Sequence, residues 1–259
     1  MNWIESFILG VLQGLTEFLP VSSSGHLELG KYFLGIEDQC NLTFTVAVHG
    51  ATVLSIIVVF WKDISSLIKE LIKFEYNNGT KFILKILVSM IPVLILGLFF
   101  REKVETLFTG RAKLVGAMLL VTALLLILAQ YSRQTRNNIS YGNALFIGIA
   151  QAFAVIPGIS RSGATIAIGL MLGNNKEEVA KFSFLMVLVP IIGANILDLA
   201  SRNQPCGDSI GTLPILIGFF SAFFVGLLAC KWMVNLVKKG KLIYFAFYCL
   251  VIGLVALIF

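Results

Sequence analysis

Six long apolar runs limit what this 259-residue chain can fold into. Each approaches the roughly 20 residues that a helix needs to cross the hydrocarbon core of a bilayer. Lipid offers the backbone no hydrogen-bond partner, and the runs are too uniformly apolar for the alternating strands of a membrane barrel. The sequence therefore predicts an all-α polytopic membrane protein with six transmembrane helices, at about 42–61, 82–100, 112–130, 178–199, 211–230 and 242–259.

The composition excludes several classes of protein. Hydrophobic residues make up 58% of the chain and charged residues 13%, whereas about a quarter of the residues of a soluble domain are charged. A soluble globule, a disordered chain and a nucleic-acid-binding protein are therefore excluded. We interpret the net charge of +6 as basic loops that face anionic lipid headgroups.

Two further apolar stretches, 4–35 and 143–173, are each broken near the middle by Pro, Gly and Ser residues. Each half is too short to cross the membrane. Broken backbone at membrane depth is tolerated where it lines a buried or watery cavity. We prefer a re-entrant helical hairpin for each stretch, and a kinked transmembrane helix is the alternative.

The two broken stretches are copies of one another. Residues 10–35 align without gaps on 148–173, and three apolar runs follow each copy. A hairpin returns to its own side and three spans cross over, so the second copy starts from the opposite face. We therefore expect one membrane domain, 1–259, built from inverted repeats at about 1–130 and 143–259, as in many transporters. The matched positions are Gly10, Gln13, Ser22, Ser24, Gly25, Leu34 and Gly35 with Gly148, Gln151, Ser160, Ser162, Gly163, Leu172 and Gly173.

The distribution of basic residues predicts the orientation. If both broken stretches are re-entrant hairpins, twelve basic residues fall on one face of the membrane and six on the other. The richer face is expected to be cytoplasmic, which places both termini and the base of the first hairpin outside. The twelve are Lys62, Lys69, Lys73, Lys81, Arg133, Arg136, Lys176, Lys181, Lys231, Lys238, Lys239 and Lys241; the six are Lys31, Arg101, Lys103, Arg111, Lys113 and Arg202.

Polar residues concentrate at the two breaks. The first has the sequence QGLTEFLPVSSSGHLE at 13–28, and the second has PGISRSGAT at 157–165. An ionisable group at the bilayer centre costs at least about 2.5 kcal/mol. Glu17, His26 and Arg161 must therefore be paired, hydrated or bound to a ligand.

These residue types suit phosphate chemistry. The N-terminus of each second half-helix is an anion site, and Arg161 adds a bidentate fork for phosphate oxygens. Glu17 is a hard carboxylate that suits Mg²⁺ or Ca²⁺. His26 can transfer a proton near neutral pH, and the serines can act as nucleophiles or hydrogen-bond donors. The pattern predicts phosphoryl transfer on a lipid-borne phosphate.

The motifs QGLTEFLPVSSSGHL and PGISRSGAT resemble the two signatures of the undecaprenyl-diphosphate phosphatase family of the bacitracin-resistance type. The resemblance covers essentially the whole chain. It implies a homodimer in the bacterial cell membrane, with six transmembrane helices, two re-entrant hairpins and inverted repeats. It also implies a metal-dependent enzyme that removes the terminal phosphate of undecaprenyl diphosphate. That activity recycles the carrier lipid for cell-wall synthesis and confers bacitracin resistance.

The resemblance also implies roles for individual residues. Glu17 resembles the metal-associated glutamate, and Arg161 the arginine that binds the diphosphate. His26 resembles the catalytic histidine, and Ser23 its partner or the nucleophile. The first motif position is Glu or Gln in the family, and the Gln found here leaves one negative charge fewer for a metal. The other polar positions are expected to contact substrate or to cap helices: Gln13, Ser22, Ser24, Ser160, Ser162 and Thr165.

Two alternatives stay open. Inverted repeats and broken helices are also the architecture of transporters, so a polyprenyl-phosphate transporter or flippase is the rival function. Attack by Ser23 and direct attack by water are both compatible with the sequence. Outside the motifs, His49 is expected to pack or hydrogen bond within its span. Cys40 and Cys206 both fall in predicted outer loops, and nothing in the sequence requires a disulfide between them.

Overall fold

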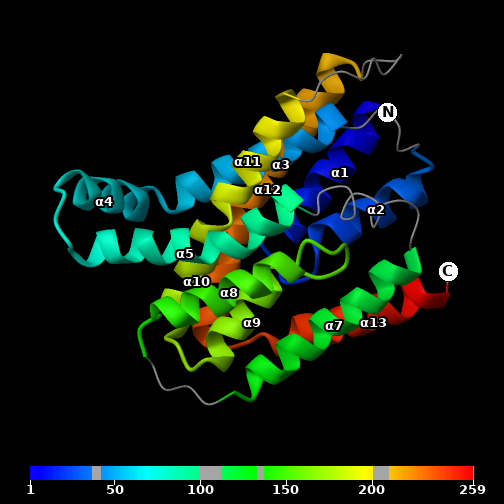
Figure 1. Cartoon of the computed structure of the whole chain (residues 1–259). Helices are drawn as coiled ribbons and strands as arrows, with labels where there is room; N and C mark the ends of the chain where they lie inside the picture. Colours follow the sequence, from blue (N-terminus) through cyan, green and yellow to red (C-terminus); the bar gives the residue numbers. More distant parts are fainter. Residues whose placement is uncertain (37–41, 100–111, 133–136, 201–209, 259) are drawn as a thin grey trace.

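The computed structural model describes residues 1–36, 42–99, 112–132, 137–200 and 210–258. Every regular element in these ranges is an α-helix (Figure 1). Cys40, Cys206, Arg133 and Arg136 lie outside the described residues. The helices are α1 (Trp3–Thr16), α2 (Ser23–Leu34), α3 (Leu42–Val59), α4 (Trp61–Ile72), α5 (Asn78–Phe99), α7 (Ala112–Gln130), α8 (Tyr141–Phe153), α9 (Arg161–Met171), α10 (Lys176–Met186), α11 (Leu188–Ala200), α12 (Thr212–Lys239) and α13 (Ile243–Ile258).

The predicted all-α membrane architecture is confirmed. Four helical segments are long and apolar enough to cross a membrane: α5, α7, α12 and the joined α10–α11. A fifth is reached if α3 and α4 count as one span, but the two helices are bent by 75° at Phe60. The sixth predicted span corresponds to α13, which has 16 residues. Six transmembrane helices therefore stay a prediction.

Each broken stretch folds as two short helices around a break. Helix α1 ends at Thr16 and α2 begins at Ser23, while α8 ends at Phe153 and α9 begins at Arg161. Within each pair the two helices contact one another. This is the helix–turn–helix shape expected of the hairpins, and their re-entry from one face stays a prediction.

Long helices support the short ones. Helix α1 packs along α12, α8 packs along α5, and α7 lies beside α13 (Figure 1). The approach is close because glycines line the contacts. A Cβ on Gly14 would lie 2.7 Å from the carbonyl oxygen of Ala222 in α12, and a Cβ on Gly148 would lie 2.8 Å from Cα of Ser89 in α5. Small residues at such crossings let helix backbones approach within the membrane.

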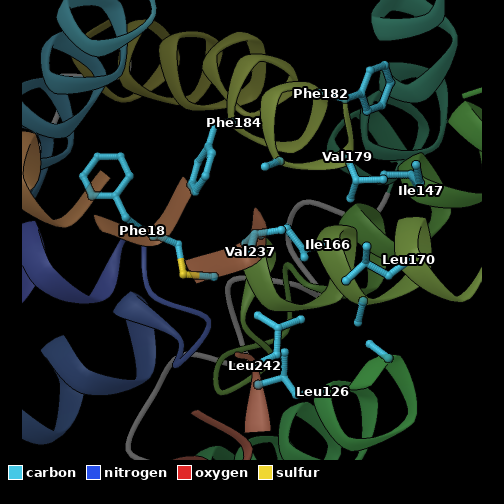
Figure 2. Close-up of a cluster of buried hydrophobic side chains, with 14 of the residues drawn as sticks. Phe18, Leu126, Ile147, Ile166, Leu170, Val179, Phe182, Phe184, Val237 and Leu242 are labelled. Atoms are coloured by element: carbon cyan, nitrogen blue, oxygen red, sulfur yellow. The ribbon is translucent and has the colours of Figure 1, made fainter. Parts of the chain in front are cut away.

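The first break is part of the main hydrophobic core. Phe18 is fully buried there, with its ring 6.1 Å from that of Phe184 in α10 (Figure 2). Phe60, at the bend between α3 and α4, lies 6.0 Å from the same Phe184 ring. These aromatic contacts hold the first break against α10 and anchor the residues that precede and follow Phe18.

Residues assigned to the basic face meet in the structure. Lys181 of α10 pairs with Asp63 of α4 at 2.6 Å, and Lys238 of α12 pairs with Glu177 of α10. Three helices distant in sequence thus place charges at the same end of the molecule. The assignment of that end to the cytoplasm stays a prediction.

Candidate active site

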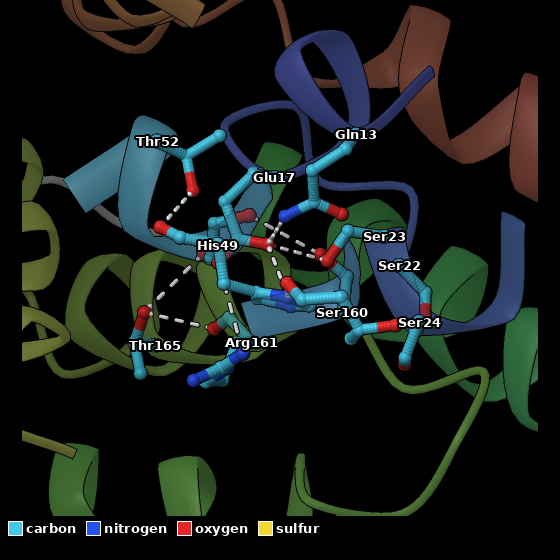
Figure 3. Close-up of polar contacts among 12 residues, drawn as sticks. Gln13, Glu17, Ser22, Ser23, Ser24, His49, Thr52, Ser160, Arg161 and Thr165 are labelled. Atoms are coloured by element: carbon cyan, nitrogen blue, oxygen red, sulfur yellow. Dashed lines mark hydrogen bonds and ion pairs between the residues drawn. The ribbon is translucent and has the colours of Figure 1, made fainter. Parts of the chain in front are cut away.

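The carboxylate of Glu17 is the centre of a polar cluster between the two breaks (Figure 3). Its side chain is 5% exposed. Oε2 accepts hydrogen bonds from Ser23 Oγ at 2.6 Å and from Gln13 Nε2 at 2.9 Å. Nη2 of Arg161 lies 3.6 Å from Oε1. The fold therefore joins the predicted Glu17, Ser23 and Arg161 into one constellation, although Arg161 comes from the second copy.

Local sequence positions the Glu17 carboxylate at an electrostatic cost. Gln13 lies one helical turn before Glu17, so both side chains share a face of α1. Glu17 is the C-cap residue, and its backbone N–H donates to the Gln13 carbonyl. A negative charge at a helix C-terminus is disfavoured by about 0.3–1 kcal/mol. This unfavourable placement is offset by the donors and cations around the carboxylate.

The two breaks meet at the start of the following helices. Ser22 and Ser160 are the N-cap residues of α2 and α9, and each hydroxyl accepts the backbone N–H of the glycine three residues later. Ser162 Oγ, in the first turn of α9, donates to the Leu19 carbonyl in the first break at 3.2 Å. The contact brings the N-terminal turn of α9 onto the first break. The N-terminus of a helix favours an anion, so the first turn of α9 adds to the positive potential near the first break.

The first break contains a strained residue. Ser22 has φ of +70°, a region that costs a non-glycine residue about 1–3 kcal/mol. The turn directs the α2 N-terminus, with Ser23 as its first residue, back toward Glu17. We interpret the strain as the consequence of placing the Ser23 hydroxyl on the carboxylate.

Ser24, Ser162 and Thr165 make supporting contacts. Ser24 Oγ lies 3.4 Å from the hydroxyl of the Ser22 cap, and Ser162 Oγ lies 3.2 Å from that of the Ser160 cap. Thr165 Oγ1 donates to the Arg161 carbonyl at 3.0 Å. The matched positions of the two copies therefore make matched capping contacts, which is the structural alternative expected for them.

His26 lies away from the Glu17 carboxylate. Its Nδ1 is 2.9 Å from the Ser22 carbonyl, and its Nε2 is 2.9 Å from the hydroxyl of Tyr248 in α13. The two rings also stack, with centroids 5.6 Å apart. Ser23 thus bonds to Glu17 and not to His26, which is the partner that the family resemblance implies for it. Nothing in the apolar run around Tyr248 signals this contact.

His49 is the residue of the cluster that sequence reasoning set aside. Its Nε2 lies 4.0 Å from Oε2 of Glu17, and its Nδ1 lies 2.9 Å from the Thr45 carbonyl. A backbone carbonyl only accepts hydrogen bonds, so Nδ1 donates to Thr45, and Nε2 is the ring nitrogen nearer the Glu17 carboxylate. The signal in the sequence that could have indicated a place for His49 in the site is its position inside an apolar run.

The residues around Glu17 fit a divalent ion that is bound through one carboxylate. Among the described residues, no three His, Cys, Asp or Glu gather into a metal-binding group. Mg²⁺ is commonly held by one or two carboxylates together with substrate phosphates. Beside Glu17, Oε1 of Gln13 is buried with no partner among the described residues. One carboxylate and one free amide oxygen match that mode of binding.

Comparisons with known proteins agree on one family. Residues 6–255 match the family described as bacitracin resistance protein BacA. A Bacteroides fragilis protein named undecaprenyl-diphosphatase is 51% identical over 261 residues, which cover 100% of this chain and 98% of that protein. A protein of the same name from Parabacteroides distasonis is 52% identical over 260 residues, covering 99% and 98%. One from Desulforapulum autotrophicum is 42% identical over 275 residues, covering 100% and 98%.

Proposed function

Because the chain belongs to the bacitracin resistance protein BacA family, we propose that it hydrolyses undecaprenyl diphosphate to undecaprenyl phosphate and inorganic phosphate. The name shared by its relatives supports this activity. The observation on which the proposal depends is the hydrogen bond of 2.6 Å from Ser23 to Glu17, with Arg161 at 3.6 Å from the same carboxylate. A hydroxyl nucleophile, a proton acceptor and a phosphate-binding cation are thereby within reach of one terminal phosphate.

In the first step, Ser23 Oγ attacks the terminal phosphorus. The bond from that phosphorus to the bridging oxygen breaks, and undecaprenyl phosphate leaves. The proton of the hydroxyl passes to Oε2 of Glu17, which already accepts it as a hydrogen bond. We assign the proton transfer to Glu17 and not to His26, because both ring nitrogens of His26 are occupied by Ser22 and Tyr248.

Positive charge for the transferring phosphoryl group comes from two sources in this chain. Arg161 presents a guanidinium that can bind two phosphate oxygens. The N-termini of α2 and α9, which begin at Ser23 and Arg161, add backbone N–H groups and the positive ends of two helix dipoles. Glu17 and Gln13 would hold a divalent ion, Mg²⁺ or Ca²⁺, which neutralises charge on the phosphate oxygens when bound.

The cellular setting follows from the same proposal. The enzyme would lie in the bacterial cell membrane as a homodimer, with the site opening to the outer face. There it would regenerate the carrier lipid for peptidoglycan synthesis and confer resistance to bacitracin. The site cluster lies toward the end of α1 that is remote from Asn2, inside the molecule, so a diphosphate headgroup must descend between the hairpins to reach it.

The test is phosphate release from undecaprenyl diphosphate by the purified protein in detergent, with Mg²⁺, with Ca²⁺ and with chelator. We expect metal-dependent release that is lost in Arg161→Ala and Ser23→Ala while both variants stay folded. A folded wild-type protein that releases no phosphate under any metal condition would contradict the proposal. Turnover that survives in Ser23→Ala would contradict the covalent route and favour direct attack by water.

A polyprenyl-phosphate transporter is the second candidate, supported by the equivalent packing of the two copies. Gly10 of α1 contacts Gly218 and Ser221 of α12, while its counterpart Gly148 of α8 contacts Ser89 of α5. Such equivalence is typical of alternating-access proteins. Scrambling of labelled polyprenyl phosphate in vesicles, unaffected by Glu17→Gln, would support transport over hydrolysis.

A further inference from the structure

A small cavity adjoins the Glu17–Arg161 pair. Its volume is about 10 Å³, which is the space that one water molecule needs. The polar side of the cavity includes two residues that the mechanism above does not use, Gln151 and Ser183; its other polar residues are Glu17, Arg161, Ser162 and Thr165. Phe18, Ile56, Phe184 and Val187 close its apolar side.

The two unused residues have polar atoms that need a partner. Gln151 is fully buried and Ser183 is 3% exposed. Oε1 of Gln151 and Oγ of Ser183 have no hydrogen-bond partner among the described residues. The Gln151 amide nitrogen donates to Met90 Sδ at 3.9 Å, so the amide oxygen is the atom left over. Buried polar atoms of this kind normally bond to protein or to an ordered water.

The cavity therefore has the chemistry of a single-water site. A water bound there can donate to Oε1 of Gln151 and exchange a hydrogen bond with Oγ of Ser183, with Glu17 and Arg161 as further partners. Two to four polar partners are what an internal water requires. Gln151 is the counterpart of Gln13 in the sequence repeat, so one copy's glutamine binds the carboxylate and the other copy's glutamine is free for the water.

We propose that this cavity holds the water that hydrolyses the phosphoserine formed at Ser23, an inference that rests on the function proposed above. Ser23 is not among the residues that line the cavity, whereas Arg161 is. In this proposal a phosphoryl group on Ser23 is bound by Arg161 and lies between the serine and the cavity. Displacement at phosphorus requires the entering and leaving oxygens to be roughly in line.

The step balances with water as the co-reactant. The water oxygen forms a bond to phosphorus, and the bond from phosphorus to Ser23 Oγ breaks. The proton that Glu17 Oε2 took in the first step returns to Ser23 Oγ and restores the hydroxyl, while both water protons leave with the inorganic phosphate and one of them can pass to solvent. The apolar wall of Phe18 and Phe184 offers water no hydrogen-bond partner, so the bound molecule is oriented by the polar side of the cavity.

The experiment compares Ser183→Val, which removes the hydroxyl and fills the cavity, with Ser183→Ala, which removes the hydroxyl and leaves the space. Each protein is given undecaprenyl diphosphate labelled with ³²P in the terminal phosphate, and acid-stable label on the protein is measured beside phosphate release. We expect kcat of Ser183→Val to fall about 100-fold with KM within about two-fold, because a displaced reactant slows chemistry without weakening lipid binding. Labelled enzyme should accumulate, and Ser183→Ala should lose about ten-fold or less.

Gln151→Met tests the same water through its other partner. The substitution keeps the side-chain length and removes the acceptor, so we expect a lower kcat and accumulation of labelled enzyme even if Ser183→Val fails to fold. Normal turnover in the folded variants, with no accumulated label, would overturn the water site and leave the phosphatase function standing. Absence of phosphate release by the wild-type protein would instead overturn the function itself, and the water site with it.

Discussion

Replacing Glu17 by Gln removes one charge and almost no volume, so it removes the proton acceptor of the proposed reaction and, at saturating divalent metal, keeps an oxygen ligand in its place. The hydrogen bond from Ser23 is 2.6 Å long, which is typical of a hydroxyl donating to a carboxylate. A neutral amide can still accept this bond but cannot take the proton. Loss of general-base catalysis costs about 10²–10⁴ in rate, and we expect kcat to fall about 10³-fold, or about 4 kcal/mol in activation free energy.

The same substitution should not weaken substrate binding. Arg161 lies 3.6 Å from the Glu17 carboxylate and shares its charge with it. Without that carboxylate the guanidinium is free for phosphate oxygens, so KM should stay level or fall. The unfolding temperature should stay within about 4 °C of the wild type, because removing a buried carboxylate also removes the cost of its desolvation.

The assay is single-turnover and steady-state phosphate release in detergent at saturating divalent metal. Glu28→Gln is the matched control, because it makes the same chemical change on α2 at a carboxylate that pairs with Lys31 at 3.3 Å. We expect near-normal kcat for that control. Glu17→Gln with more than about a tenth of wild-type kcat would refute the assignment of Glu17 as proton acceptor.

Three further predictions concern stability and cofactor dependence. Tyr248→Phe should lower the free energy of unfolding by about 1 kcal/mol and reduce kcat less than ten-fold, because Tyr248 holds His26 at 2.9 Å outside the carboxylate cluster. Thermal unfolding measures the first effect and phosphate release the second. A loss of kcat as large as that of Ser23→Ala would show a direct role for Tyr248 in the reaction. Gly14→Ala should lower the free energy of unfolding by about 1–3 kcal/mol, because the added carbon would lie 2.7 Å from the Ala222 carbonyl oxygen. An unchanged unfolding transition in denaturant would contradict the close approach of α1 and α12. Chelation should abolish phosphate release and added Mg²⁺ or Ca²⁺ should restore it; turnover that persists in chelator would remove the metal from the proposal.

The breaks could be predicted from the sequence because their signals are local. Apolar run length predicts helices that suit a membrane, and Pro, Gly and Ser predict where those helices stop. In the structure one helix ends before Glu17 and the next begins after it, and the same holds around Pro157. Both breaks therefore lie inside the two stretches that Pro, Gly and Ser interrupt. A charged side chain at membrane depth must be paired, hydrated or bound to a ligand, so the sequence also predicts that Glu17 and Arg161 each need a partner.

The partners of individual side chains could not be predicted in the same way. His26 follows a serine run beside Glu17 in sequence, yet it bonds to Tyr248 on α13, while His49 on α3 faces the carboxylate. Helices in lipid are apolar on every face, so their sequence does not mark the side that packs against the site.

What the sequence by itself determined is the class of protein, the helical breaks and the residue types available for phosphate chemistry, because hydropathy and backbone preference act over a few neighbouring residues. What the tertiary structure alone decided is which of those residues share a site. The packing of helices that are far apart in the sequence, such as α1 with α12 and α8 with α5, brings Arg161 to Glu17 and leaves Gln151 and Ser183 on one cavity. Such packing depends on close contacts between residues far apart in the chain, for which no short motif provides a signal.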